Sequence, residues 1–165
     1  MQWKRALRHL VTDQWTVRRV FPASAMRAIR RTIELQESRH GGELRFAVEA
    51  SLPLRGLWRG QSARARAVEL FGQLRIWDTE HNNGVLIYLL LADKRVEIIA
   101  DRGIDRKVGG ANWESICRAM QRSFAQGHFE QGAQAGIVAI SDLLAAHYAQ
   151  TVVHPDELPN EPLVL

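Results

Sequence analysis

Hydrophobic side chains follow one another without a polar interruption from Val85 to Leu91. An apolar run of this length predicts a strand that is covered on both of its faces. The Asn-Asn-Gly sequence at 82–84 is a turn signal ahead of it, and the Asp-Lys pair at 93–94 marks a reversal into a second strand over 95–101. The pattern therefore predicts an antiparallel hairpin, which brings the residues before its first strand and after its second strand to one edge of a sheet.

Apolar residues spaced three and four apart predict helices in much of the rest of the chain. These helices are expected over 2–11, 24–40, 61–77, 112–126 and 129–149, and a strand with alternating apolar residues is expected over 43–51. In the helix over 61–77, the side chains expected to face inward are Val68, Phe71, Leu74 and Trp77.

The order of these elements predicts an α/β fold, with irregular loops at the glycine-containing segments 52–60 and 102–110. A strand–helix–strand crossover implies parallel strands, and the hairpin adds an antiparallel one. With helices on both faces, the result is a three-layer α/β/α sandwich around a small mixed sheet. We divide the chain into an N-terminal amphipathic helical segment (1–21), an α/β domain (22–150) and a proline-containing C-terminal tail (151–165), which we expect to be mobile.

The N-terminal segment carries Trp3, Leu7, Leu10 and Val11 along one stripe of its helix, with basic residues outside the stripe. Such a helix either packs its stripe against the domain or lies on an anionic membrane surface. Its short length favours packing.

Composition narrows the class of protein. The chain has 165 residues, of which 46% are hydrophobic, so it is long enough for one globular domain with a real core. The one cysteine, Cys117, cannot form an internal disulfide, and it lies on the apolar side of its helix, where core packing is expected. The sequence shows neither a signal-peptide pattern nor an apolar run of about 18 residues. We therefore expect a soluble cytoplasmic protein without a transmembrane segment.

The formal net charge is +4, and arginines gather near the loop over 52–60. Arg55, Trp58 and Arg59 are expected to bind a partner, because Trp and Arg are enriched in protein interfaces. That partner is most simply another protein, including one associated with a membrane. Nucleic acid is disfavoured, since binding without sequence preference needs a basic groove with several stacking aromatic side chains.

Polar residues with metal-binding side chains gather at the two ends of the hairpin. The set consists of Asp78, Glu80, Asn82, Asn83, Asp101 and Asp105. Calcium takes six to eight oxygen ligands from such groups, whereas magnesium keeps several waters. The alternative is turn chemistry, in which Asp and Asn bind the local backbone. Two neighbours add to the candidates: Arg102, as a phosphate ligand or a partner of an acid, and His81, as a general acid or phosphate contact.

Three stretches of the chain resemble the TPM domain family. They are ELRFAVEA at 43–50, NNGVLIYLLLADKRVEIIADRGI at 82–104 and GHFEQG at 127–132, and the resemblance extends over roughly residues 20–150. It implies an α/β sandwich, and it implies the calcium binding or acid-phosphatase-like activity assigned to members of that family. Where many members have Asp immediately before Asn-Gly, this chain has Asn82, which removes one negative charge from the expected site. Typical members also carry a signal peptide and a membrane anchor. Because this sequence shows neither pattern, we expect an anchor-less cytoplasmic member of the family.

Two functions are compatible with these features. The first is a TPM-like binding or assembly module with a cation or phosphate site at the sheet edge, since no nucleophile–base pair is recognisable. The second is a weak acid phosphatase acting on phosphomonoesters. In this alternative Asp78, Glu80 and Asp101 would hold calcium or magnesium, and Arg102 would stabilise developing charge.

Overall fold

A computed structural model describes residues 3–148 and 157–165 of the chain. Its elements are α1 (Trp3–Val11), α2 (Gln14–Val20), α3 (Ala23–Glu37), β1 (Glu43–Glu49), α4 (Leu54–Trp58), α5 (Ala63–Gln73), β2 (Gly84–Leu90), β3 (Arg95–Ala100), α6 (Arg102–Val108), α7 (Gly110–Ala125), α8 (Phe129–His147) and β4 (Leu163–Val164). In the part of the chain that these ranges cover, no helix has both the length and the apolarity that crossing a bilayer requires.

The four strands form one mixed sheet in the order β3-β2-β1-β4. β1 and β2 are parallel, with Glu43 opposite Gly84, and the helices α4 and α5 lie between them in the chain. β2 and β3 are antiparallel, with Val85 opposite Ala100 and Leu90 opposite Arg95. The predicted crossover and hairpin are both confirmed, and so is the α/β class.

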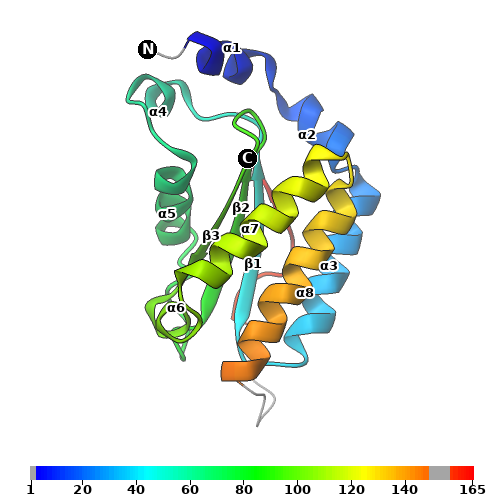
Figure 1. The fold of residues 1–165 in the computed structure, drawn as a ribbon, viewed down its shortest axis with the longest axis vertical. Coiled ribbons are helices and arrows are strands. Elements are labelled where there is room, and N and C mark those ends of the chain that lie inside the picture. Colours follow the sequence, from blue (N-terminus) through cyan, green and yellow to red (C-terminus); the bar gives the residue numbers. More distant parts are fainter. Residues whose placement is uncertain (1–2, 149–156) are drawn as a thin grey trace.

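Helices lie on both faces of the sheet, as Figure 1 shows. The larger core lies between the sheet and α3, α7 and α8, where side chains such as Ile29, Phe46, Ile87 and Ile137 are buried. Phe46 belongs to the alternating set of β1, whose other side chains point to the opposite face. The alternation in the sequence therefore separates the two cores.

The smaller core lies under α5, and here the predicted helix face is wrong. α5 begins where the Ser62 hydroxyl accepts a hydrogen bond from the Ala65 N–H at 3.1 Å. The side chains of α5 that are buried against the sheet are Ala63, Ala67 and Leu70. Val68, on this helix, and Trp77, beyond its end, are both 53% exposed, while Phe71 and Leu74 pack at the margin of this core. Small alanine side chains let the helix approach the sheet closely. A prediction that looks for the largest apolar side chains on a helix does not pick them out.

Three segments expected to be irregular or mobile contain regular structure. Residues 54–58 form α4, and residues 102–108 form α6, whose first turn is capped by Asp101. At the C-terminus, β4 pairs with β1 in parallel, with Ala47 opposite Leu163, so the segment that was expected to be mobile contributes an edge strand. Residues 151–156 of that tail lie outside the described residues.

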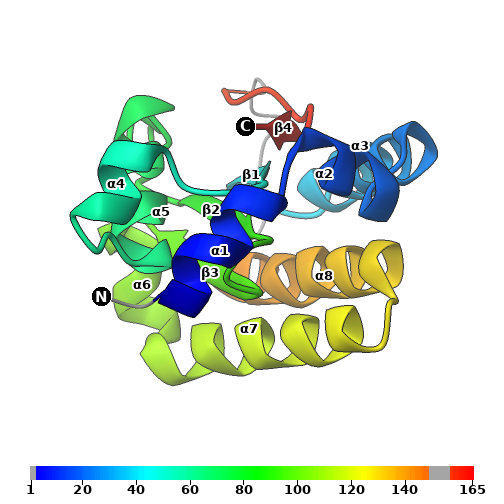
Figure 2. The ribbon, with the colours of Figure 1, turned by 90° about the horizontal axis from the view of Figure 1, so that it is seen from above.

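The N-terminal helix docks with the face opposite to the one predicted. Its apolar stripe points away from the domain, and its polar side faces the ends of β1 and β2. The side chains of Trp3, Leu7, Leu10 and Val11 are between 62 and 78% exposed. Figure 2 shows α1 lying across this end of the molecule beside α2 and α4. The expectation that the stripe packs against the domain is therefore wrong.

Candidate functional site

The hairpin register places the two polar loops against each other, as predicted. The Asp101 N–H donates to the Gly84 carbonyl at 2.9 Å, one residue beyond the last paired positions of β3. Next to this bond, a Cβ added to Gly103 would lie 2.4 Å from the Asn82 carbonyl oxygen. The approach is that close only because Gly103 has no side chain. Asn82 itself has a φ of 51°, in the left-handed region that Asn tolerates.

Asn83 and Asp101 are the two buried members of the predicted set, with exposed fractions of 1% and 7%. Asn83 donates from Nδ2 to the Gly41 carbonyl at 2.5 Å, and Asp101 Oδ1 accepts from the Arg102 N–H at 2.5 Å. The single side-chain oxygen of Asn83, Oδ1, and the second carboxylate oxygen of Asp101, Oδ2, are buried without a hydrogen-bond partner among the described residues. Buried polar atoms without partners are rare, so these two oxygens call for a ligand or another explanation.

Gly41, whose carbonyl accepts from Asn83, connects this end of the sheet to Tyr148 at the end of α8, and Tyr148 in turn contacts Lys107 of α6. The Gly41 N–H donates to the Tyr148 carbonyl at 3.0 Å, and the Lys107 ammonium lies 3.9 Å from the centroid of the Tyr148 ring. His40, one residue earlier, is buried, and burial lowers the pKa of its imidazole to about 4. At neutral pH this ring is therefore uncharged and does not repel a cation.

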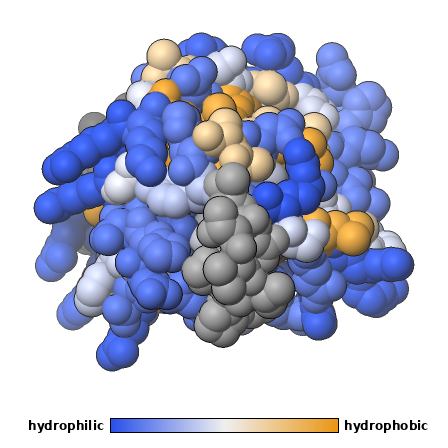
Figure 3. Space-filling model, turned by 90° about the horizontal axis from the view of Figure 1, so that it is seen from below, coloured by the Kyte–Doolittle hydropathy of each residue, from blue (hydrophilic) through white to orange (hydrophobic). Residues whose placement is uncertain are grey.

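The other predicted ligands lie at the surface of the same end. Asp78, Glu80 and Asn82 are exposed, and the Glu80 N–H donates to the Glu157 carboxylate at 3.1 Å. Figure 3 shows this end of the molecule, where hydrophilic side chains cover most of the described surface. Asp105 Oδ1 instead accepts from the Trp113 indole N–H at 3.0 Å. Within residues 3–148 and 157–165, no three His, Cys, Asp or Glu side chains gather closely enough to hold a metal between them.

The remaining candidates do not meet the buried pair through their side chains. Arg102 is exposed, and its backbone N–H is the group bonded to Asp101. His81 is exposed in the loop before β2. Arg55, Trp58 and Arg59 lie exposed on and just after α4, toward the opposite end of the sheet, so partner binding through them stays a prediction (Figure 1). Cys117 is partly buried, and burial raises the pKa of its thiol to about 11.

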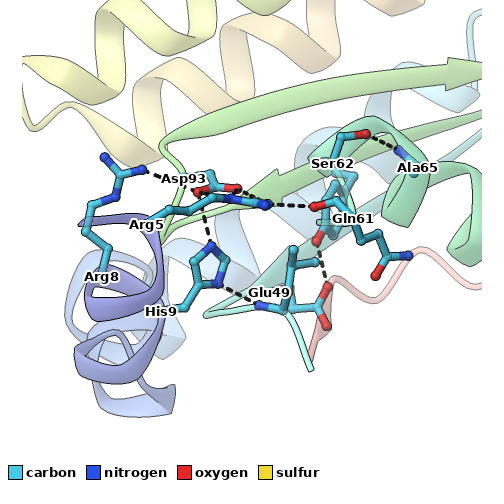
Figure 4. A network of polar contacts seen from close by, with 10 residues as sticks. Arg5, Arg8, His9, Glu49, Gln61, Ser62, Ala65 and Asp93 are labelled. Atoms are coloured by element: carbon cyan, nitrogen blue, oxygen red, sulfur yellow. Dashed lines mark hydrogen bonds and ion pairs between the residues drawn. The ribbon is translucent and has the colours of Figure 1, made fainter. Parts of the chain in front are cut away.

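Sequence reasoning missed a polar network at that opposite end, around Asp93 in the β2–β3 turn (Figure 4). Arg5 Nε lies 3.1 and 3.0 Å from the two Asp93 oxygens, and Arg5 donates through its terminal nitrogen to Oδ2 at 2.7 Å and to the Gln61 carbonyl at 2.7 Å. His9 Nε2 lies 3.0 Å from Asp93 Oδ1, and its Nδ1 accepts from the Leu52 N–H at 3.0 Å. The Leu52 bond leaves Nε2 as the protonated nitrogen, so both ring nitrogens are occupied in holding α1.

A second carboxylate lies at the same end of the sheet. Glu49, at the end of β1, is buried and accepts two hydrogen bonds from Arg66, each at 3.0 Å, and one from the Tyr88 hydroxyl at 2.6 Å. The hydrogen bonds to the Glu49 carboxylate raise the pKa of the Arg66 guanidinium. The sequence carries only a weak signal for the contacts of Arg5 and His9 with Asp93. Both residues stand on the polar side of their helix, and that side was expected to face solvent.

Comparison with known proteins gives the same fold. The TPM domain family matches residues 17–143 of this chain. The NMR structure of the BA42 protein from the psychrophilic bacterium Bizionia argentinensis is similar, with a TM-score of 0.76 and 31% identity over 87% of this chain and 94% of that chain. The N-terminal domain of a protein from P. gingivalis shares the fold, with a TM-score of 0.64 and 19% identity over 82% and 83% of the two chains. No curated protein matches the sequence.

Proposed function

Because this chain belongs to the TPM domain family, we propose that it is a TPM-type binding module whose sheet edge at Asn83 and Asp101 holds a hard divalent cation. One observation carries the proposal: two side-chain oxygens, Asn83 Oδ1 and Asp101 Oδ2, are buried without a described partner. They belong to two loops whose backbones meet at the hydrogen bond from the Asp101 N–H to the Gly84 carbonyl. A hard cation is the ligand that fits carboxylate and amide oxygens. Calcium comes first among the candidates, because it accepts neutral carbonyl ligands and water alongside a single carboxylate.

The chemistry of the donors fits such an ion better than it fits phosphate. Asp101 supplies a negative charge, Asn83 supplies a neutral oxygen, and the nearby His40 ring is uncharged at neutral pH because burial lowers its pKa to about 4. Phosphate would instead need donors aimed into the site, and Arg102 is exposed. Asp101 also caps α6 through its other oxygen, which fixes the carboxylate in place. The turn chemistry weighed from the sequence thus accounts for Oδ1 and leaves Oδ2 to a ligand.

Titration of the folded protein with calcium, magnesium or phosphate, followed by thermal unfolding, tests the proposal. A ligand that binds only the folded state stabilises it by about 2.7 kcal/mol at a hundred times its Kd. We expect a calcium-dependent rise in Tm that Asp101→Asn abolishes. Asn is an equally good helix cap, so this change removes the charge while keeping the cap. Asp105→Asn, a change of the same kind at the carboxylate bonded to Trp113, is the matched control and should keep the response.

Two results would count against the site. A calcium-dependent rise in Tm that survives in Asp101→Asn would place the ion elsewhere. A rise in Tm with phosphate alone would indicate an anion site in place of a cation site. The phosphatase alternative is tested on the same samples: it requires cation-dependent hydrolysis of p-nitrophenyl phosphate that Asp101→Asn abolishes. We expect no such difference, since the acids that the alternative adds, Asp78 and Glu80, are exposed.

A further inference from the structure

The outer face of α1 is an exposed apolar surface. An amphipathic helix on a globular domain normally buries its apolar stripe. Here Arg5 and His9 are turned toward the domain, and the stripe of large apolar side chains is turned outward. The ion pair from Arg5 to Asp93 and the hydrogen bond from the Leu52 N–H to His9 fix this orientation, so the exposure of the stripe is a specified feature of the fold.

Neighbouring elements also carry exposed apolar side chains. Trp15 in α2 is 71% exposed, and Trp58 in α4 is 83% exposed. A surface hollow of about 550 Å³ is bordered by Leu10 of α1 and by Leu54 and Leu57 of α4, so the two helices share one surface. Seen from above, α1, α2 and α4 lie together at this end of the molecule (Figure 2). Contiguous exposed apolar residues of this kind mark a binding surface.

The charge around this surface is mainly positive. Residues 3–21 and 54–60 contain a single acidic residue, Asp13. The exposed basic side chains in these two ranges are Lys4, Arg8, Arg18, Arg19, Arg55 and Arg59. Anionic lipid headgroups attract such a cluster, and tryptophan side chains prefer the boundary between headgroups and acyl chains. An interfacial helix with Trp and Leu on one side and Lys and Arg beside them combines the same two features.

We propose that α1, with Trp15 and α4 beside it, binds the surface of an anionic membrane peripherally. The apolar stripe enters the boundary between headgroups and acyl chains, and the basic side chains at its flanks meet the lipid phosphates. The network around Asp93 holds the helix flat against the domain so that the stripe faces the bilayer. The Asn83–Asp101 end of the sheet then points away from the membrane, since it lies at the opposite end of the strands (Figure 1).

The test is co-sedimentation of the full chain with vesicles of phosphatidylcholine containing phosphatidylglycerol, compared with vesicles of phosphatidylcholine alone. We expect binding to the anionic vesicles that weakens as salt shortens the Debye length from about 10 Å at 0.1 M to about 3 Å at 1 M. Leu7→Glu should weaken binding by at least about tenfold, because a leucine side chain leaves the apolar phase and a negative charge is added. Tryptophan emission should shift to the blue when the wild-type chain binds.

Leu35→Glu is the matched control. Leu35 is 66% exposed, against 62% for Leu7, but it lies on α3, away from this surface. The two variants have the same net charge, so a general electrostatic effect moves both equally. Equal binding of the two variants, or no binding of the wild-type chain to anionic vesicles, would overturn the proposal. Self-association without vesicles that Leu7→Glu abolishes would assign the surface to a second copy of the chain, and binding of a protein partner in place of vesicles would likewise end the membrane assignment.

Discussion

Replacing Asp93 with alanine removes the group on which the docking of α1 depends. The Asp93 side chain is 10% exposed, and it pairs with Arg5, 15% exposed, at 2.7 Å and with His9 at 3.0 Å. Breaking a buried pair from one side costs about 3 kcal/mol, because the partner charge stays buried without compensation. The apolar stripe of α1 points outward, so it offers little packing to make up for this loss. We therefore expect Asp93→Ala to lower the free energy of unfolding by about 3 kcal/mol, or to release α1 at a smaller global cost.

Urea unfolding together with hydrogen exchange separates these two outcomes. A loss of global stability lowers the urea midpoint, whereas release of α1 removes amide protection in residues 3–11 and leaves the sheet protected. Asp142→Ala is the control, because Asp142 pairs with Arg39 at 2.9 Å but is 58% exposed. An exposed pair contributes only about 0.2–1 kcal/mol. The reasoning is refuted if the two variants have the same unfolding free energy and the same protection of α1.

The same carboxylate predicts a dependence on pH. Burial raises the pKa of Asp93, but the hydrogen bonds from Arg5 and His9 outweigh it, and the pKa in the folded state lies below the usual value. For a carboxyl whose pKa is lowered on folding, the stabilisation is present above the unfolded pKa of about 3.9 and is lost as the pH falls through the folded value. Protection of α1 should therefore persist at pH 5 and decline only in more acidic solution.

Two further changes test the other end of the sheet. Gly103→Ala places a methyl group 2.4 Å from the Asn82 carbonyl oxygen and should cost about 1–3 kcal/mol in urea unfolding. Gly110→Ala, where a methyl group would meet no described atom beyond its chain neighbours and its own helix backbone, should stay within about 0.5 kcal/mol. Burial lowers the pKa of His40 to about 4, so its stabilisation is present above the unfolded pKa of about 6.5 and is lost as the pH falls from there toward 4. His40→Gln should flatten that part of the stability profile, and an unchanged slope would assign it to another group.

The hairpin was predictable because its signals are local. The apolar run of β2, the turn at 82–84 and the reversal at 93–94 fix both strands and their pairing, and that pairing alone places Asp101 beside Gly84. The resemblance to the TPM domain family rests largely on the same stretch, and the family match confirms it. The gathering of polar loops at one edge followed from this register without any knowledge of the rest of the fold.

What the sequence did not reveal depends on partners far away in the chain. The orientation of α1 is decided by Asp93, which stands 88 residues after Arg5, so the periodicity of α1 identifies an apolar face but not the side that docks. β4 has two residues, too few to show any period, and it forms because the edge of β1 is open to it. Within the predicted site, the pattern did not distinguish the buried Asn83 and Asp101 from the exposed Asp78 and Glu80, since all four belong to polar segments.

The proposal of a cation site at the sheet edge is tested most directly by a calcium titration of the isotope-labelled protein followed by NMR. The account predicts saturable shifts in the side-chain amide of Asn83 and in the backbone amides of Gly84 and residues 101–103, with the amides of α1 unchanged and no such shifts in Asp101→Asn. Saturable shifts centred on another part of the chain, or none at calcium concentrations that raise the Tm, would contradict it.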